Sequence, residues 1–270
     1  LLEKVWGRLG NIPFFENQAI NFYRRKHKTI LDYLYKEFDV FLSNYSEEKY
    51  EEKSETSKKI FTMWIQGIEN IPLIVKKTIE SQKKYAEKFG YEFIFLDKNN
   101  IFNYIQLPEI IVEKYEKGII DFIKFSDIVR VTLLAKYGGV WLDATVLLTD
   151  NIPQKYFEME YFMFQRDDNL KDKKKWEDFD SVYFSWDKDM RVRVMNSVIF
   201  AKKNNKVIKT LLDLLLIFWK YNEKAPKYFF FQILYYELME NYYKKYQCEI
   251  VSDTYSHELM KVWYEKYKEK

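Results

Sequence analysis

The segment from Phe125 to Val146, FSDIVRVTLLAKYGGVWLDATV, constrains the fold more than any other part of the chain. It begins with a helical pattern of apolar residues, passes through a double glycine and ends in a short apolar stretch followed by a carboxylate. Gly138 and Gly139 permit the positive φ values that end a helix, and the residues after them favour a strand. Asp143 is therefore expected at the end of a core strand, where α/β sheets bind ligands.

The helix of this segment carries a charged pair. Asp127 and Arg130 are three residues apart and share one face, while the apolar residues of the helix can pack on a core. This arrangement leaves a carboxylate and a guanidinium to face a ligand. Spacing alone is equally compatible with an Asp143 that caps a turn and an Arg130 that pairs with Asp127 on a solvated helix.

Composition bounds the class of protein. The chain has 270 residues and 47% hydrophobic content, which suits one large domain or a domain with an appendage. A net charge of +3 from 44 basic and 41 acidic residues is too balanced to indicate nucleic-acid binding, so nucleic acid is not expected as a partner. The single cysteine, Cys248, excludes an intrachain disulfide and fits a reducing compartment.

No apolar run approaches the roughly 18 residues that span a bilayer, and the start of the chain lacks the apolar core of a signal peptide. We therefore expect a cytoplasmic protein, with peripheral contact at the inner face of the cell membrane as an option. The many tyrosines and lysines suit a lipid interface or sugar binding, but they suit an AT-rich genome as well.

Periodicity predicts an α/β chain with extra helices at both ends. A helix is expected from about Glu16 to Tyr50, followed by a charged linker, so that residues 1–57 form a helical extension and 58–270 the main domain. A strand–helix–strand unit with parallel strands is expected next, made of KIFTMWI, a helix ending at Gly90, and YEFIFLD. A helix over 100–117 follows. Later strands are EYFMFQ and RVMNSVIFAK, and later helices are KVIKTLLDLLLIFWKY and YFFFQILYYELMENYYKKY.

SDIVR followed by YGGVWLDAT resembles the signature region of the DXD-containing sugar transferases. These include capsular polysaccharide synthesis glycosyltransferases, family 32-like α-glycosyltransferases and the large clostridial glucosylating toxins. The resemblance extends from about Lys59 to Ala201, with a weaker echo towards His257. It implies a Rossmann-like GT-A fold, a nucleotide-sugar donor and retention of the anomeric configuration.

The resemblance also assigns roles to residues. Asp127 and Arg130 would hold the sugar hydroxyls of the donor, and Asp143 would be the first aspartate of the DXD motif, with Thr145 in place of the second. Mn²⁺ or Mg²⁺ would then be bound by Asp143, Thr145 and His257, although threonine is a poorer ligand than aspartate. A lone histidine is otherwise more often structural.

Three further side chains have both a binding and a packing interpretation. Trp64 and Gln66 resemble first-strand residues near the nucleotide, where Trp64 would stack on uracil, but core packing explains a tryptophan almost as well. Asn196 matches an amide near the reacting sugar and could equally be a satisfied amide at a strand end. Gln232 stands where the capsular branch has a histidine, and a core helix is preferred for its segment.

Together with these residues, the resemblance implies a retaining bacterial transferase that moves galactose or glucose from a UDP-sugar to a lipid-linked repeat unit of a capsule or other surface glycan. Asp143, Arg130 and Asn196 would serve the transfer by stabilising the departing diphosphate and the reacting sugar. A toxin-like protein glycosyltransferase is one alternative. A non-enzymatic module is another, with LLDLLLIFW and YFFFQILYYEL as a partner-binding surface. The carboxylates present do not exclude glycosidase chemistry.

Overall fold

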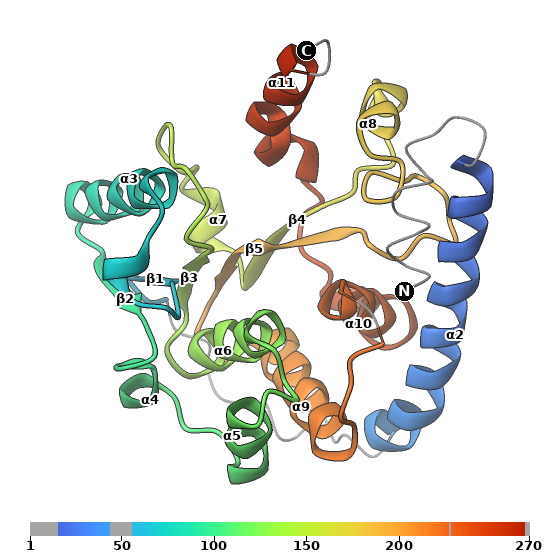
Figure 1. Cartoon of the computed structure of the whole chain (residues 1–270), viewed down its shortest axis with the longest axis horizontal. Helices are drawn as coiled ribbons and strands as arrows, with labels where there is room; N and C mark the ends of the chain where they lie inside the picture. The colour runs from blue at the N-terminus through green and yellow to red at the C-terminus, as the bar shows by residue number, and fades with distance from the viewer. Residues whose placement is uncertain (1–15, 44–55, 227, 268–270) are drawn as a thin grey trace.

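The computed structural model describes residues 16–43, 56–226 and 228–267. Its centre is a five-stranded mixed sheet with the strand order β2-β1-β3-β5-β4 (Figure 1). The strands are β1 (Lys59–Met63), β2 (Glu92–Leu96), β3 (Gly139–Leu142), β4 (Tyr161–Gln165) and β5 (Val194–Ala201). The sequence prediction of an α/β fold is therefore confirmed.

Strand direction decides which loops meet. β1 pairs in parallel with β2 and β3, whereas β5 runs antiparallel to both β3 and β4. The predicted parallel pair joined by a helix is thus present as β1, α3 (Leu73–Phe89) and β2. As a result, the carboxyl ends of β1, β3 and β4 lie at the same edge of the sheet as the amino end of β5.

Helices cover both faces of this sheet (Figure 1). One core packs α3 and α7 (Lys155–Glu158) on Ile60, Val140 and Phe162. The other core packs α6 (Phe122–Tyr137), α9 (Lys206–Tyr221) and α10 (Phe230–Leu238) on the opposite side, against the alternate residues of the same strands. This alternation is the two-residue period of a strand that is buried on both faces.

The double glycine is required where α6 turns into β3. Gly138 and Gly139 both have positive φ, 68° and 101°. A Cβ at Gly138 would lie 2.5 Å from the backbone nitrogen of Lys203, and one at Gly139 would lie 2.4 Å from the carbonyl oxygen of Lys59. Conformation and close backbone contact therefore both demand glycine here, as the sequence indicated.

The predicted helix over 100–117 is wrong in one respect, because the structure divides it. α4 (Ile101–Tyr104) and α5 (Glu109–Glu116) are separated by an extended stretch that ends at Pro108, the residue before α5. Proline lacks the backbone N–H that a continuous helix needs, so one helix cannot run through Pro108. Proline does suit the position just before a helix begins. The predicted strand and helix boundaries around Gly90 are confirmed, with Gly90 as the left-handed C-cap of α3.

The N-terminal helix α2 (Glu16–Ser43) runs along the flank of the molecule (Figure 1). It contacts α10, and the hydroxyl of Tyr33 donates to Oδ1 of Asn222 at 2.8 Å. The last residues of the predicted helix, up to Tyr50, and most of the expected linker lie outside the described residues. The division into 1–57 and 58–270 stays a prediction.

The two apolar segments considered as a partner-binding surface lie mainly inside the protein. In α9, Leu211, Leu214 and Phe218 are buried, and in α10 so are Phe231 and Leu234. Gln232 is buried in the same helix, as expected of a core position. The surface proposed for a non-enzymatic module is therefore a core interface between the two helices and the sheet, which corrects that alternative.

The remaining elements are short. They are the 3₁₀ helix Ile68–Asn70 after β1, α8 (Lys173–Phe179), a π-helix over Met239–Tyr243, a 3₁₀ helix over Lys244–Tyr246, a 3₁₀ helix over Asp253–His257 and α11 (Glu258–Tyr267). Within the described ranges, no helix combines the length and apolar character needed to cross a membrane.

Candidate functional site

Arg130 lies between two carboxylates at the edge of the sheet where β3 ends. Its Nη2 is 3.4 Å from Oδ1 of Asp127, and its Nη1 is 3.5 Å from Oδ1 of Asp143. The side chains of Asp127 and Arg130 are 6% and 5% exposed, whereas that of Asp143 is 31% exposed. The predicted charged pair is thus buried rather than on a solvated helix face. Asp143 is the one of these three side chains that solvent reaches.

Several contacts fix the guanidinium of Arg130. Nε donates to the Ser126 carbonyl at 3.2 Å, Nη2 donates to Oγ of Ser126 at 3.0 Å, and Nη1 donates to the Asn196 carbonyl. The group also lies 5.3 Å from the centroid of the Trp141 ring. Arg130 therefore holds one orientation before any ligand arrives.

Asn196, at the start of β5, completes what we call the Arg130 cluster: Asp127, Arg130, Asp143 and Asn196. Its Nδ2 donates to Oδ1 of Asp127 at 2.8 Å, and its Oδ1 accepts from Nε2 of Gln232 at 3.0 Å. The structure thus brings together the three residues predicted to serve the transfer. Gln232, which was predicted only as a core residue, orients the Asn196 amide.

Asp143 sits in a turn that is held from two sides. Its backbone N–H donates to the Ser197 carbonyl at 2.8 Å, and its Oδ1 accepts from Nε1 of Trp141 at 2.6 Å. From α3, Nε2 of Gln82 donates to the carbonyls of Asp143 and Val146 at 3.0 and 2.8 Å. These contacts leave Oδ2 of Asp143 without a hydrogen bond to any described residue.

Burial raises the pKa of Asp127 to about 6. The positive charges of Arg130 and Lys124 oppose this shift, and the negative charge of Asp143 adds to it. Asp127 therefore changes its protonation state close to neutral pH, and the charge of the Arg130 cluster changes with it.

Trp64 and Gln66 follow β1 at the same edge of the sheet. Trp64 is half-buried, and its backbone N–H donates to the Leu96 carbonyl at 2.9 Å. Its indole Nε1 is buried and has no hydrogen-bond partner among the described residues, whereas Gln66 is exposed. Their predicted roles at a nucleotide stay predictions.

The three predicted metal ligands have different surroundings. Thr145 is exposed, two residues beyond Asp143. His257 is half-buried, its Nδ1–H donates to the Asp253 carbonyl at 2.7 Å, and its ring packs against Tyr183 and Phe184. Across the described part of the chain, no three His, Cys, Asp or Glu side chains gather as a metal-binding group. Metal binding by these residues stays a prediction.

A cavity of about 610 Å³ adjoins the Arg130 cluster. Asn196 and Ser197 form part of its wall next to Asp143, while Gln232 and His257 lie on other parts of the wall. We call it the His257 cavity. It is large enough to hold a sugar beside the cluster.

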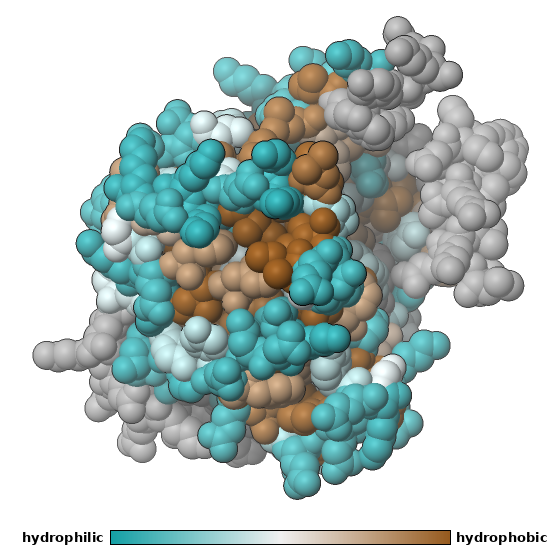
Figure 2. Space-filling view, turned by 60° about the vertical axis from the view of Figure 1, so that its left-hand side comes forward, coloured by the Kyte–Doolittle hydropathy of each residue, from teal (hydrophilic) through white to brown (hydrophobic). Residues whose placement is uncertain are grey.

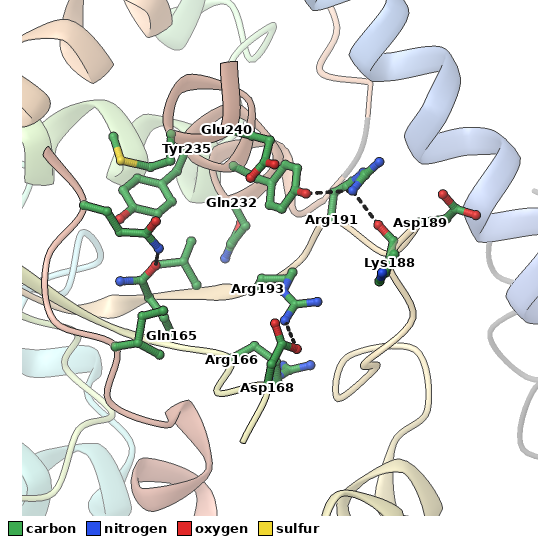
Figure 3. Close-up of a pocket in the computed structure, with 15 residues that line it drawn as sticks. Gln165, Arg166, Asp168, Lys188, Asp189, Arg191, Arg193, Gln232, Tyr235 and Glu240 are labelled. Carbon is green, nitrogen blue, oxygen red and sulfur yellow. Dashed lines mark hydrogen bonds and ion pairs between the residues drawn. The ribbon is translucent and has the colours of Figure 1, made fainter. Parts of the chain in front are cut away.

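A second cavity, of about 530 Å³, lies where β4 ends and β5 begins (Figure 3). Arg166, Lys188, Arg191 and Arg193 supply its cations, and Gln232 belongs to the walls of both cavities. We call it the Arg191 cavity. Sequence reasoning missed it, although the signal is present in RVRVMN, where alternation places Arg191 and Arg193 on one face of an extended segment.

Arg166 was missed as well. It forms a buried ion pair with Asp253, with Nη2 2.8 Å from Oδ2 and Nε 3.1 Å from Oδ1, and the two side chains are 0% and 1% exposed. Its Nη1 and Nη2 also donate to the carbonyls of Ser185 and Tyr183, respectively. The partners are distant in sequence, so no local pattern could reveal the pair.

Comparison with known families identifies the class. A family model described as capsular polysaccharide synthesis protein matches residues 11–270, and the chain belongs to this family. Among solved structures, one described as the PaToxG glycosyltransferase is similar, with a TM-score of 0.42 and 17% sequence identity, over 84% of this chain and 80% of that chain. No curated protein matches the chain.

Proposed function

We propose that this protein is a GT-A type, retaining glycosyltransferase of capsule synthesis that moves a hexose, galactose or glucose, from a UDP-sugar to a glycan acceptor. The observation that carries the proposal is the setting of Arg130. It is a fixed guanidinium between a buried carboxylate and an exposed one, at the ligand-binding edge of an α/β sheet. The matching family supports the role in capsule synthesis.

Each member of the Arg130 cluster has a chemical task in this reaction. Asp127 and the Asn196 amide accept and donate hydrogen bonds at sugar hydroxyls, which are both donors and acceptors. Arg130 stabilises the negative charge of the departing UDP. Two ionised carboxylates within 3.5 Å of Arg130 more than offset its single positive charge, so the Arg130 cluster does not by itself neutralise a diphosphate.

A divalent metal would supply the missing positive charge. Oδ2 of Asp143 is the oxygen best placed to bind Mn²⁺ or Mg²⁺, with Thr145 and His257 as the further ligands proposed from the sequence. A single carboxylate suits a metal that takes its other ligands from substrate phosphates and water. We therefore expect the metal to bind tightly only together with the nucleotide.

The proposed acceptor is a lipid-linked glycan at the inner face of the membrane. Apolar side chains gather on the side of the molecule that carries α3 and β2 (Figure 2). Ile68, Leu73 and Ile74 are exposed beside the end of β1, and Lys76 and Lys77 follow in α3. Apolar side chains next to lysines suit an anionic lipid surface.

The test is binding and hydrolysis of UDP-galactose and UDP-glucose, with and without Mn²⁺, by the wild type, Asp143→Ala and Arg130→Ala. Circular dichroism checks that each variant is folded. We expect manganese-dependent binding of one donor, lost in both variants. A folded wild type that binds no nucleotide sugar would disprove the proposal, and transfer to a polypeptide without any lipid-linked glycan would favour the toxin-like alternative.

Membrane contact has its own test. Wild type and Leu73→Ser/Ile74→Ser are sedimented with vesicles of phosphatidylglycerol and phosphatidylcholine. We expect the wild type to sediment with the anionic vesicles and the variant to remain in the supernatant, while both bind UDP equally. Equal sedimentation of the two would remove this face from the proposal.

A further inference from the structure

The Arg191 cavity opens at the same edge of the sheet as the Arg130 cluster, but on the side of β4. Gln165 and Arg166 at the end of β4 and Val194 at the start of β5 form its floor. Residues of α10 and the following turn, among them Tyr235 and Glu240, line the side opposite the strands (Figure 3).

The cations of this cavity differ in how they are neutralised. Arg166 is neutralised by Asp253, and Arg193 pairs with Asp168. Arg191 donates only to neutral oxygens, the Lys188 carbonyl and the Tyr236 hydroxyl. Within the described ranges, neither Arg191 nor the side chain of Lys188 forms an ion pair with a carboxylate.

Two further carboxylates line the cavity, Asp189 and Glu240, and both are exposed to water. Figure 3 shows Asp189 on the side of α2, away from Gln232 and Arg193. Water and salt screen such exposed charges, whereas an anion inside the cavity could contact Arg191 directly. Burial raises the pKa of the Glu237 carboxyl and the positive charge of Arg191 opposes that shift, so these two groups interact without forming an ion pair. A guanidinium that forms no ion pair with a carboxylate in a polar cavity suits a carboxylate or phosphate ligand.

Arg191 is also held in place from the N-terminal helix. Its backbone N–H donates to Nδ1 of His27 at 3.1 Å, and Arg24 forms an ion pair with Asp187 in the same loop. The guanidinium of Arg191 lies 4.7 Å from the centroid of the Tyr236 ring. The site is therefore largely preorganised, which lowers the cost of binding.

Gln232 connects this cavity to the Arg130 cluster. It lines both cavities, donates to Oδ1 of Asn196, and Asn196 donates in turn to Asp127. A molecule that fills the Arg191 cavity and contacts Gln232 is thus two hydrogen bonds from the carboxylate proposed to hold the donor sugar.

We propose that the Arg191 cavity binds the acceptor through a negative group, so that the acceptor is a glycan carrying a sugar carboxylate or a phosphate ester. This inference rests on the proposed function, because it assigns the second substrate of that reaction. Arg191 and Lys188 bind the anion, and Gln232 contacts the sugar ring that faces the donor.

The test uses the full chain and three probes: methyl β-glucuronide, inorganic phosphate and the neutral methyl β-glucoside. Binding is measured by ligand-observed NMR for the wild type, Arg191→Ala, Arg191→Lys and Lys188→Ala. Arg25→Ala, which removes one exposed charge from α2 outside the cavity, is the matched control. UDP binding is measured on each sample. Because Lys188 is exposed, its variant tests the site even if Arg191→Ala folds poorly.

We expect an anionic probe to bind at least tenfold more weakly to Arg191→Ala, with partial recovery in Arg191→Lys and no change in Arg25→Ala or in UDP binding. Selective binding of glucuronide would identify an acidic sugar, and selective binding of phosphate a phosphate ester. The inference is overturned if the neutral glucoside binds as well as the anions, or if no probe depends on Arg191 and Lys188 while UDP still binds. Loss of UDP binding in the wild type would instead overturn the proposed function.

Discussion

Two buried arginines at one edge of the sheet differ in how completely they are satisfied. Arg166 forms a two-pronged pair with Asp253, and its Nη1 and Nη2 also donate to backbone carbonyls. Arg130 contacts two carboxylates at 3.4 and 3.5 Å, one of them open to solvent. An arginine held by short contacts to buried partners joins segments of the fold, whereas an arginine with longer contacts and an exposed partner can still exchange them for a ligand.

The largest expected effect tests the structural arginine. Arg166→Met leaves Asp253 buried without a partner, so the free energy of unfolding should fall by about 3–5 kcal/mol. Urea denaturation measures it. As a control, Arg166→Met/Asp253→Leu removes both charges and should recover most of the loss. A single-variant loss below about 1 kcal/mol would contradict a structural role for this pair.

Asp143→Asn should separate function from stability. The amide keeps an oxygen for Nε1 of Trp141 but loses the charge, so we expect donor turnover to fall by about 10² to 10³. Because the side chain is 31% exposed, unfolding should change by less than about 1 kcal/mol. Asp150→Asn, an exposed carboxylate beyond the same turn, is the matched control and should leave turnover unchanged.

The pH dependence of donor binding should follow Asp127, whose pKa is about 6. If the ionised carboxylate holds the sugar, affinity should fall about tenfold from pH 7 to pH 5, because about one molecule in ten stays ionised at pH 5. Titration calorimetry at several pH values measures it. Asp127→Asn should bind weakly and with a flat profile, and an equally steep profile in this variant would show that another group titrates.

The raised pKa of Asp127 also affects the free energy of unfolding. A carboxyl whose pKa is raised in the folded state binds more protons there than in the unfolded chain. Its contribution to stability therefore falls as pH rises from about 4 to about 6 and stays low above that. Asp127→Asn should lack this dependence of the unfolding free energy on pH, which urea denaturation at several pH values measures.

The smallest effect concerns the link between the two cavities. Gln232→Ala removes one neutral hydrogen bond to Asn196, so transfer should fall by about three- to tenfold. UDP affinity should change by less than about twofold, because Gln232 does not belong to the Arg130 cluster. Rates of transfer and of UDP-sugar hydrolysis are compared, and an equal fall in both would mean that Gln232 serves the donor alone.

Local sequence patterns were sufficient for much of the fold. The glycines at 138 and 139 and the apolar VWL placed Asp143 correctly, because cap chemistry and strand propensity are local. Only the family resemblance, and no local pattern, predicted that Asn196 belongs to the same site. The predicted helix over 100–117 is divided before Pro108, because proline breaks a helix even where the apolar spacing continues.

The rest depended on contacts between distant segments. Arg166 meets Asp253 across 87 residues, and Arg191 is held by His27 across 164. No spacing rule connects such pairs, since the topology of the sheet and the packing of α2 create them. The sequence therefore could not predict the Arg191 cavity as a whole, although alternation places two of its three arginines, Arg191 and Arg193, on one face.

The antiparallel direction of β5 affects which segment of the chain can vary among related proteins. Segment 166–193 leaves β4 and enters β5 at the same edge, so its length can change without altering the pairing of either strand. It carries every cation of the Arg191 cavity. Insertions or exchanges within this one segment could therefore give related enzymes different acceptors while the remainder of the sheet and the Arg130 cluster stay the same.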